Sequence, residues 1–202
     1  VGFLRRILRK LSLLRPDALF IAGDLFDGTD VDLAPLAKPW AEFSAPLGAY
    51  FITGNHEQFA SPAKYLDAVR QSGIRVLDNE KIVLDGLQLV GVHYRDAVHE
   101  ERFRAILQRA ALDRNSASIL LVHNPNRLAV AQEAGISLQL SGHTHRGQFF
   151  PWTRVVSRIY GPFAYGLHRF GEMLVYTSCG AGTWGPPMRL GSNPEIVLLQ
   201  FE

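Results

Sequence analysis

Four apolar segments of this chain are each followed at once by polar residues that can bind a metal. The segments cover residues 18–22, 49–53, 118–122 and 138–140, and the residues that follow are Gly23-Asp24, Gly54-Asn55-His56-Glu57, His123-Asn124-Pro125 and Ser141-Gly142-His143-Thr144-His145. Uniformly apolar runs bounded by turn residues are typical of strands covered on both faces. In open α/β sheets, ligands bind outside the carboxyl ends of the strands. The pattern therefore predicts a site at one sheet edge, assembled from sequence-distant pieces.

The stretches between these strands predict helices and several further strands. We expect helices over residues 1–14, 31–43, 62–72, 100–112 and 127–134, and strands at 75–77, 81–84, 88–93, 173–178 and 195–201. Residues 146–171 are rich in aromatic residues, glycine and proline, and are expected to form an irregular loop. Because helices alternate with strands and no long polar linker divides the chain, the sequence indicates an α/β fold in a single domain, residues 1–202.

The first helix is amphipathic and basic. Its apolar residues recur at helical spacing, and Arg5, Arg6, Arg9 and Lys10 fill the gaps. Such a helix lies on a membrane surface or packs on a sheet as a crossover helix. Packing is favoured, because Pro16 ends the helix and an apolar strand follows at once. The chain begins within this helical pattern and shows no signal-peptide pattern, so we expect it to start inside a domain.

The composition is typical of a folded protein and argues against several functional classes. Hydrophobic residues make up 47% of the 202 and charged residues 20%, which does not indicate disorder. The net charge of +2 does not indicate nucleic-acid binding, so no nucleic acid is expected as a partner. No apolar run reaches the roughly 18 residues that a membrane span needs. The single cysteine, Cys179, excludes an internal disulfide framework.

Asp24, Asn55, His123, His143 and His145 are the candidate metal ligands. Carboxylate, amide oxygen and imidazole together suit Mn²⁺, Fe²⁺, Zn²⁺ or Co²⁺, and no set of thiolates demands a softer metal. Since His143 and His145 are two residues apart, their rings lie on one side of an extended segment or reach different ions from a tight loop. Each residue alone is more often structural, as a turn or a hydrogen-bonded core histidine. The ordered combination favours a metal site.

The ordered motifs resemble those of the calcineurin-like metallophosphoesterase family: Gly23-Asp24, Gly54-Asn55-His56-Glu57, His123 and Gly142-His143-Thr144-His145. The similarity extends along essentially the whole chain and is greatest to the YkuE-type branch. That branch is also similar to transmembrane proteins with a metallophosphoesterase domain. The resemblance implies a four-layer αββα sandwich. It also implies a metal-dependent phosphodiesterase or phosphatase that uses a metal-bridging hydroxide.

Carried over residue by residue, the resemblance implies two divalent ions (Mn, Fe or Zn) and assigns ligands to the first: Asp24, Asn55, His123 and His143. Asp24 would also bridge to the second ion, which His145 would bind. His56 would not bind metal. It would instead stabilise a phosphoryl oxygen of the substrate or protonate the leaving group.

Other residues near the motifs suggest supporting roles. Arg146 follows the histidine pair, where it would either bind a phosphate or remain a solvated loop residue. Asp27 and Glu57 are expected to orient ligand histidines, with stabilisation of the Asp24 loop as the other role for Asp27. The aromatic residues at 149–152 and 160–170 would either line an apolar or membrane-facing rim or pack beneath the loop. The expected partners are a phosphoester, lipid-linked or of the cell envelope, and a membrane surface, in a bacterial protein that is membrane-associated or exported.

The opening Asp-x-His motif of the family has no counterpart in this sequence. It would lie just before the helix that includes Phe3, and without it the second ion keeps only Asp24 and His145. Either the chain is a fragment that lacks its first strand, which the mid-helix start favours, or it is a one-metal or non-catalytic relative that serves as a binding or scaffold protein. His93 or His99 could replace the missing ligands, although neither follows the family pattern.

Overall fold

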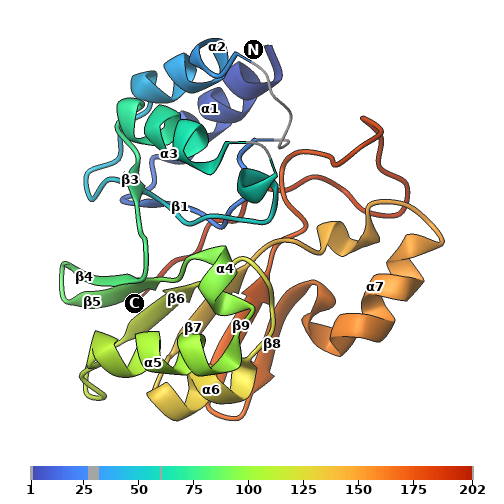
Figure 1. Cartoon of the computed structure of the whole chain (residues 1–202). Coiled ribbons are helices and arrows are strands. Elements are labelled where there is room, and N and C mark those ends of the chain that lie inside the picture. The colour runs from blue at the N-terminus through green and yellow to red at the C-terminus, as the bar shows by residue number, and fades with distance from the viewer. Residues whose placement is uncertain (1, 27–31, 60, 202) are drawn as a thin grey trace.

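Two β-sheets lie face to face and carry helices on their outer sides (Figure 1). This computed structural model describes residues 2–26, 32–59 and 61–201. The small sheet has the order β1-β2-β3, with β1 at Leu19–Ile21, β2 at Ala49–Phe51 and β3 at Arg75–Val76. The large sheet has the order β4-β5-β6-β7-β9-β8, and its strands are β4 Glu80–Leu84, β5 Leu87–Gly91, β6 Ser118–Leu121, β7 Leu138–Ser141, β8 Gly166–Phe170 and β9 Met173–Thr177.

Most strands run parallel, which brings their carboxyl ends to the same edge. In the small sheet β1 pairs with β2 and β2 with β3, all parallel. In the large sheet β5, β6, β7 and β9 are parallel, and only β4 and β8, at the two edges, are antiparallel to their neighbours. Parallel strands joined by helices are buried on both faces, which accounts for their largely apolar sequences.

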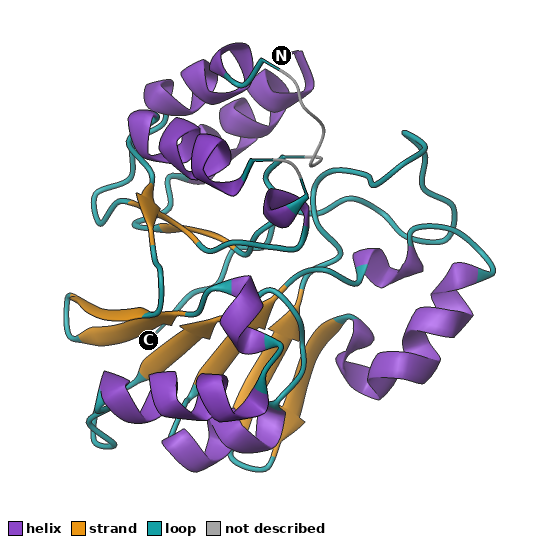
Figure 2. Cartoon of the chain, in the orientation of Figure 1, coloured by secondary structure: helices purple, strands orange, loops and turns teal. Residues whose placement is uncertain are grey.

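Helices cover the outer face of each sheet, as Figure 2 shows. The small sheet is covered by α1 (Gly2–Leu14), α2 (Ala34–Ala37), a 3₁₀ helix at Lys38–Glu42 and α3 (Pro62–Gln71). The large sheet is covered by α5 (Glu100–Ala110) and α6 (Leu128–Ala134), with the short α4 (Tyr94–Ala97) before them. Helix α7 (Trp152–Tyr160) projects at one end of the large sheet, beyond these layers (Figure 1).

Three apolar clusters fill the three spaces between the layers. Phe51 points into the cluster under α1 and α3, whereas its neighbours Tyr50 and Ile52 point into the cluster between the sheets. In β6, Leu120 belongs to the cluster under α5 and α6, and Ile119 to the one between the sheets. Alternate side chains of a strand face opposite layers, so apolar residues occupy most positions on both sides of these strands. The predicted α/β fold, a four-layer αββα sandwich, is confirmed.

Several local predictions agree with the structure and others are wrong. Helix α1 buries Leu8 and Leu11 in the cluster above the small sheet, as expected of a crossover helix. Residues 146–171 are not an irregular loop, because α7 and β8 form there. Residues 195–201 form no strand, since no described strand pairs with them. Of the helix expected over 31–43, the described part forms only α2 and a 3₁₀ turn, and α4 was not predicted.

None of the helices in the described part of the chain combines the length and apolar character needed to cross a membrane.

Candidate metal centre

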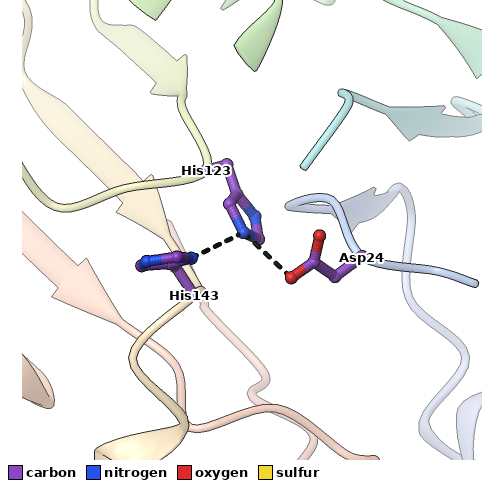
Figure 3. A group of neighbouring side chains, drawn as sticks. All are labelled: Asp24, His123 and His143. Atoms are coloured by element: carbon purple, nitrogen blue, oxygen red, sulfur yellow. Dashed lines mark hydrogen bonds and ion pairs between the residues drawn. The ribbon is translucent and has the colours of Figure 1, made fainter. Parts of the chain in front are cut away.

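The carboxyl ends of four strands converge at one place between the two sheets. Asp24 lies after β1, Asn55 after β2, His123 after β6 and His143 after β7. Figure 3 shows Asp24, His123 and His143 turned toward one another, and one ligand atom from each lies within 4.8 Å of the others. Side chains separated by up to 119 positions therefore meet because parallel strands end at a common edge.

The distances between the polar atoms are short. The Oδ2 atom of Asp24 lies 3.1 Å from Nε2 of His123, which lies 3.1 Å from Nδ1 of His143. The Oδ1 atom of Asn55 lies 3.1 Å from Nε2 of His123 and 2.8 Å from Nδ1 of His143. These four side chains form a single cluster, which we call the Asp24 cluster.

The Asp24 cluster holds more acceptor atoms than protons. Nδ1 of His123 lies 2.6 Å from the carbonyl oxygen of Ala22, and a carbonyl only accepts, so Nδ1 carries the proton of the neutral ring. Nε2 of His123 is then an acceptor facing two oxygen acceptors, Asp24 Oδ2 and Asn55 Oδ1. With the Asn55 amide oriented so that Oδ1 faces both rings, only His143 can supply a proton to the group in the neutral state. A cation would satisfy all four atoms, so these residues fit a divalent metal.

Burial keeps His143 and His145 neutral, and neighbouring groups keep Asp24 charged. Burial, helped by the charge of His123, lowers the pKa of His143 to about 4. Burial and the nearby Arg189 lower the pKa of His145 to about 4. Burial would raise the pKa of Asp24, but the hydrogen bond and charge of His123 and the backbone N–H of His56 bring it below its usual value. Neutral imidazoles and an ionised carboxylate are the forms that bind metal.

The comparisons with known proteins agree with this chemistry. Residues 2–147 match the calcineurin-like phosphoesterase family. The chain belongs to the calcineurin-like phosphoesterase family. Over 100% of its length it is 33% identical to an uncharacterized metallophosphoesterase of Campylobacter jejuni, of which it covers 54%. Over 96% of its length it is 33% identical to a transmembrane protein with metallophosphoesterase domain of Danio rerio, of which it covers 48%.

A third relative is the uncharacterized metallophosphoesterase YkuE of Bacillus subtilis, which is 28% identical over 98% of this chain and of which the chain covers 72%. These relatives support the YkuE-type branch. The chain spans about half the length of the first relatives it matches. The family is one of metal-dependent phosphoester hydrolases, and the Asp24 cluster of this chain is a group that can hold a metal ion.

The backbone of the chain is strained at the candidate ligands. Asp24 has φ of 53°, His143 of 66° and His145 of 48°. These values lie in the left-handed region, which costs a residue with a side chain about 1–2 kcal/mol. Strain of this kind persists only where surrounding contacts impose it, and it gathers at functional sites.

Glu57 supplies those contacts for the loop after β1. It is fully buried, and its carboxylate accepts hydrogen bonds from the backbone N–H groups of Asp24 (3.0 Å), Leu25 (2.9 Å), Phe26 (3.3 Å) and Gly54 (2.7 Å). Burial and the charge of Asp24 raise the pKa of Glu57. Glu57 was predicted to orient a ligand histidine, and that interpretation is wrong. Its hydrogen bonds instead tie the loops after β1 and β2 together.

Asp27, the other residue predicted to support the site, lies outside the described residues.

His145 stands apart from the Asp24 cluster. It is not among the residues whose ligand atoms meet within 4.8 Å. Its Nδ1 atom is buried and has no hydrogen-bond partner in the described part of the chain. His145 and Asp24 both line a groove of about 1050 Å³ that runs along β1 and the extended residues 196–201. An unpartnered imidazole nitrogen beside the Asp24 carboxylate is suited to a further ion.

The other residues selected from sequence lie in different surroundings. The backbone N–H of His56 donates to Oδ1 of Asp24 (3.0 Å), and its Nε2 lies 3.9 Å from Oδ2; the side chain is buried. Arg146 is exposed, and its guanidinium lies over the ring of Tyr165, 4.5 Å from the centroid. His93 accepts a hydrogen bond from the backbone N–H of Arg95 at the start of α4, and His99 precedes α5.

Three residues around the site were not singled out from sequence. The rings of Tyr94 and Tyr160 meet those of His123 and His143 edge-on, with centroids 5.8 and 6.3 Å apart. Burial raises the pKa of both tyrosines, so both remain hydrogen-bond donors. Arg189 donates to the carbonyl oxygen of His145 and so attaches the C-terminal segment to the histidine loop. No local pattern marks these residues, because their partners are distant in sequence.

We expect Gly54→Ala to lower the free energy of unfolding of the protein by roughly 1–3 kcal/mol, the usual cost of overpacking. A Cβ at Gly54 would lie 2.7 Å from the backbone nitrogen of Asp24 and would collide with the Asp24 carboxylate. Moving that carboxylate should also weaken Mn²⁺ binding. Urea unfolding and isothermal titration calorimetry measure the two effects.

Gly182→Ala is the matched control for this substitution, because a Cβ there meets nothing within 4 Å. Its free energy of unfolding should change by less than about 0.5 kcal/mol. Equal stability of the two variants would show that the loops after β1 and β2 can separate without cost.

Proposed function

We propose that this protein is a metal-dependent phosphoester hydrolase, a phosphodiesterase or a phosphatase. Its first ion is bound by Asp24, Asn55, His123 and His143. The observation that carries the proposal is the excess of acceptor atoms over protons in the Asp24 cluster, at distances of 2.8–3.1 Å. A phosphoester is an anion that a nucleophile must approach, and this chemistry requires positive charge at the reacting group.

A divalent ion bound there supplies a coordinated water of lowered pKa and neutralises charge on the phosphoryl oxygens. The protein's own residues hold the reacting groups in place. His56 is fixed beside Asp24 through its backbone N–H and donates a proton to the leaving oxygen or a hydrogen bond to the phosphoryl group. Tyr94 and Tyr160 flank the ligand histidines as protonated donors. Arg146 pairs with a substrate phosphate after leaving the ring of Tyr165.

A second ion would be held by Asp24 and His145, with its remaining ligands supplied by an extended segment seated in the groove. The edge of β1 that faces away from β2 has no partner among the described strands. A strand added there parallel to β1 would end beside Asp24 and His145. The apolar side chains of β1 and residues 196–201 that line the groove would pack against such a strand.

We place the substrate among lipid-linked or cell-envelope phosphoesters and the protein at a bacterial membrane or envelope. The support is the pair of exposed aromatic residues, Phe150 and Trp152, that follow the histidine loop, and two relatives that are named transmembrane proteins with metallophosphoesterase domain.

Hydrolysis of bis(4-nitrophenyl) phosphate and 4-nitrophenyl phosphate, with Mn²⁺, Fe²⁺, Zn²⁺ or EDTA, tests the activity. His56→Ala should lower kcat by about 10²–10⁴, the usual contribution of a general acid, and leave Mn²⁺ affinity unchanged. His99→Ala, an exposed histidine before α5, is the control and should match the wild type. Full activity in His56→Ala would refute the assigned role.

The second candidate function is that of a non-catalytic, one-metal binding or scaffold protein. The described residues complete one ligand cluster and leave the other with Asp24 and His145. This alternative predicts tight Mn²⁺ binding by calorimetry without hydrolysis of either ester. Metal-stimulated hydrolysis abolished by EDTA would exclude it.

A further inference from the structure

Helix α7 presents an apolar face to solvent. Trp152, Val155 and Ile159 recur at i, i+3 and i+7 and therefore share one side of the helix. None of the residues of α7 is buried, and Trp152 and Ile159 are 54% and 68% exposed. Phe150, just before the helix, is also exposed. We call these four residues the α7 face. Such a face normally packs in a core, whereas here all four residues are exposed.

More exposed apolar residues lie next to α7. Trp184, Met188 and Leu190 occupy the C-terminal loop and are all exposed. This loop is tied to the residues that precede α7. The side chain of Gln148 donates to the carbonyl oxygen of Trp184 (2.7 Å). The backbone N–H of Leu190 donates to the carbonyl oxygen of Gln148 (2.9 Å). The apolar surface therefore extends beyond the helix.

The charges on α7 and in the sequence on either side of it are all positive. From residue 134 to residue 171 the chain contains four arginines, no lysine and no acidic residue. Arg154 and Arg158 lie on α7 one turn apart, on the side away from Trp152 and Ile159, and Arg154 lies over the ring of Phe150 at 5.3 Å. A helix with aromatic and aliphatic residues on one side and arginines on the other is suited to the interface of an anionic bilayer.

The C-terminal end of α7 adjoins the candidate metal centre. Tyr160, the last residue of α7, meets the ring of His143 edge-on. In Figure 1 the helix projects from the body at the end of the large sheet, which leaves it accessible to a flat surface. A bilayer in contact with α7 would bring its headgroups close to the Asp24 cluster.

We propose that the α7 face docks on an anionic lipid bilayer, with Trp152 and Ile159 among the acyl chains and headgroups and Arg154 and Arg158 on the lipid phosphates. The docking itself is independent of catalysis. Its consequence, that the substrate is a phosphoester presented at the membrane surface, rests on the proposed function. The positive charge favours this occupant over a second copy of the chain, whose α7 would carry the same arginines.

Co-sedimentation with vesicles tests the docking, in EDTA so that metal chemistry plays no part. The chain should bind vesicles of phosphatidylcholine and phosphatidylglycerol at equal parts at least tenfold more tightly than phosphatidylcholine alone, and high salt should weaken that binding. Ile159→Glu and the double variant Arg154→Gln/Arg158→Gln should each reduce it about tenfold or more. Val83→Glu replaces an equally exposed apolar residue on β4 and should bind like the wild type.

Vesicle binding by Ile159→Glu at the wild-type level, or no preference for anionic vesicles, would overturn the proposal. Light scattering provides a second outcome that would overturn the proposal: a wild type that forms a dimer and binds no vesicles, and an Ile159→Glu variant that has lost the dimer. That result would assign the α7 face to a second copy of the chain. Hydrolysis of the soluble bis(4-nitrophenyl) phosphate should be unchanged in Ile159→Glu. If the chain binds vesicles and hydrolyses nothing, the docking stands and the proposed hydrolase fails; if it hydrolyses the soluble ester without binding vesicles, the reverse holds.

Discussion

Replacing Glu57 by alanine is expected to lower the free energy of unfolding by roughly 4 kcal/mol or more. The carboxylate accepts the backbone N–H groups of Asp24, Leu25, Phe26 and Gly54 and is fully buried. Alanine would leave four donors without that acceptor, and each buried donor without a partner costs about 1–3 kcal/mol. Urea unfolding followed by the fluorescence of the three tryptophans measures the loss.

Two further variants make the result specific to the hydrogen bonds. Glu57→Gln keeps the size and one acceptor oxygen of the side chain but turns an NH₂ group toward N–H donors. Its free energy of unfolding should therefore lie between those of the wild type and Glu57→Ala. Glu80→Ala removes an exposed glutamate paired with Arg75 at 3.0 Å and should cost less than about 1 kcal/mol. If Glu57→Ala were as stable as Glu80→Ala, the loop after β1 would have to be held by other contacts.

Replacing Asp24 by asparagine is expected to weaken Mn²⁺ binding at least 100-fold. Asp24 is the one carboxylate in the described ligand cluster, and its pKa is lowered, so it supplies the negative charge of the site. Loss of a residue that only supports a ligand already costs about 10–100-fold in metal affinity, and loss of the charged ligand should cost more. Asparagine keeps the shape and an acceptor for the backbone N–H of His56, so the fold should persist. Isothermal titration calorimetry with Mn²⁺ measures the change.

Asp113→Asn is the matched control for Asp24→Asn. The pKa of Asp113 is also lowered, by hydrogen bonds from the backbone N–H of Asn115 and from Ser116, but Asp113 lies in an exposed turn before β6. Its Mn²⁺ affinity should equal that of the wild type. A bound ion should also raise the melting temperature of the wild type and of Asp113→Asn, with little effect on Asp24→Asn. Unchanged binding in Asp24→Asn would move the ion away from this cluster.

The layers of the fold could be predicted because burial leaves a direct trace in the sequence. A strand such as β2, with Phe51 facing the helices and Tyr50 facing the second sheet, is covered on both sides and is therefore built from residues that can be buried. The site could be located for a related reason. Asp24, Asn55, His123 and His143 each follow a strand that runs parallel to its neighbours, so their positions along the chain already place them at one edge.

The helix α7 and residues 195–201 could not be predicted in the same way. The apolar side of α7 faces no core, and Pro151 and Gly161 at its ends are equally typical of a loop. Residues 195–201 have the sequence of a strand but no partner strand among the described residues. Hydrogen bonding in a sheet depends on a neighbour, which local periodicity does not reveal.

The amino-acid sequence by itself determined the class of fold, the edge at which the polar side chains gather and the residue types that suit a divalent metal. Only the tertiary structure decided how those side chains are held. Glu57 binds backbone groups up to 33 positions away, and His145 lies outside the group of ligand atoms that Asp24, His123 and His143 bring together. The reason is physical: apolar periodicity is a property of each segment, whereas hydrogen bonds between loops exist only after two sheets have packed against each other.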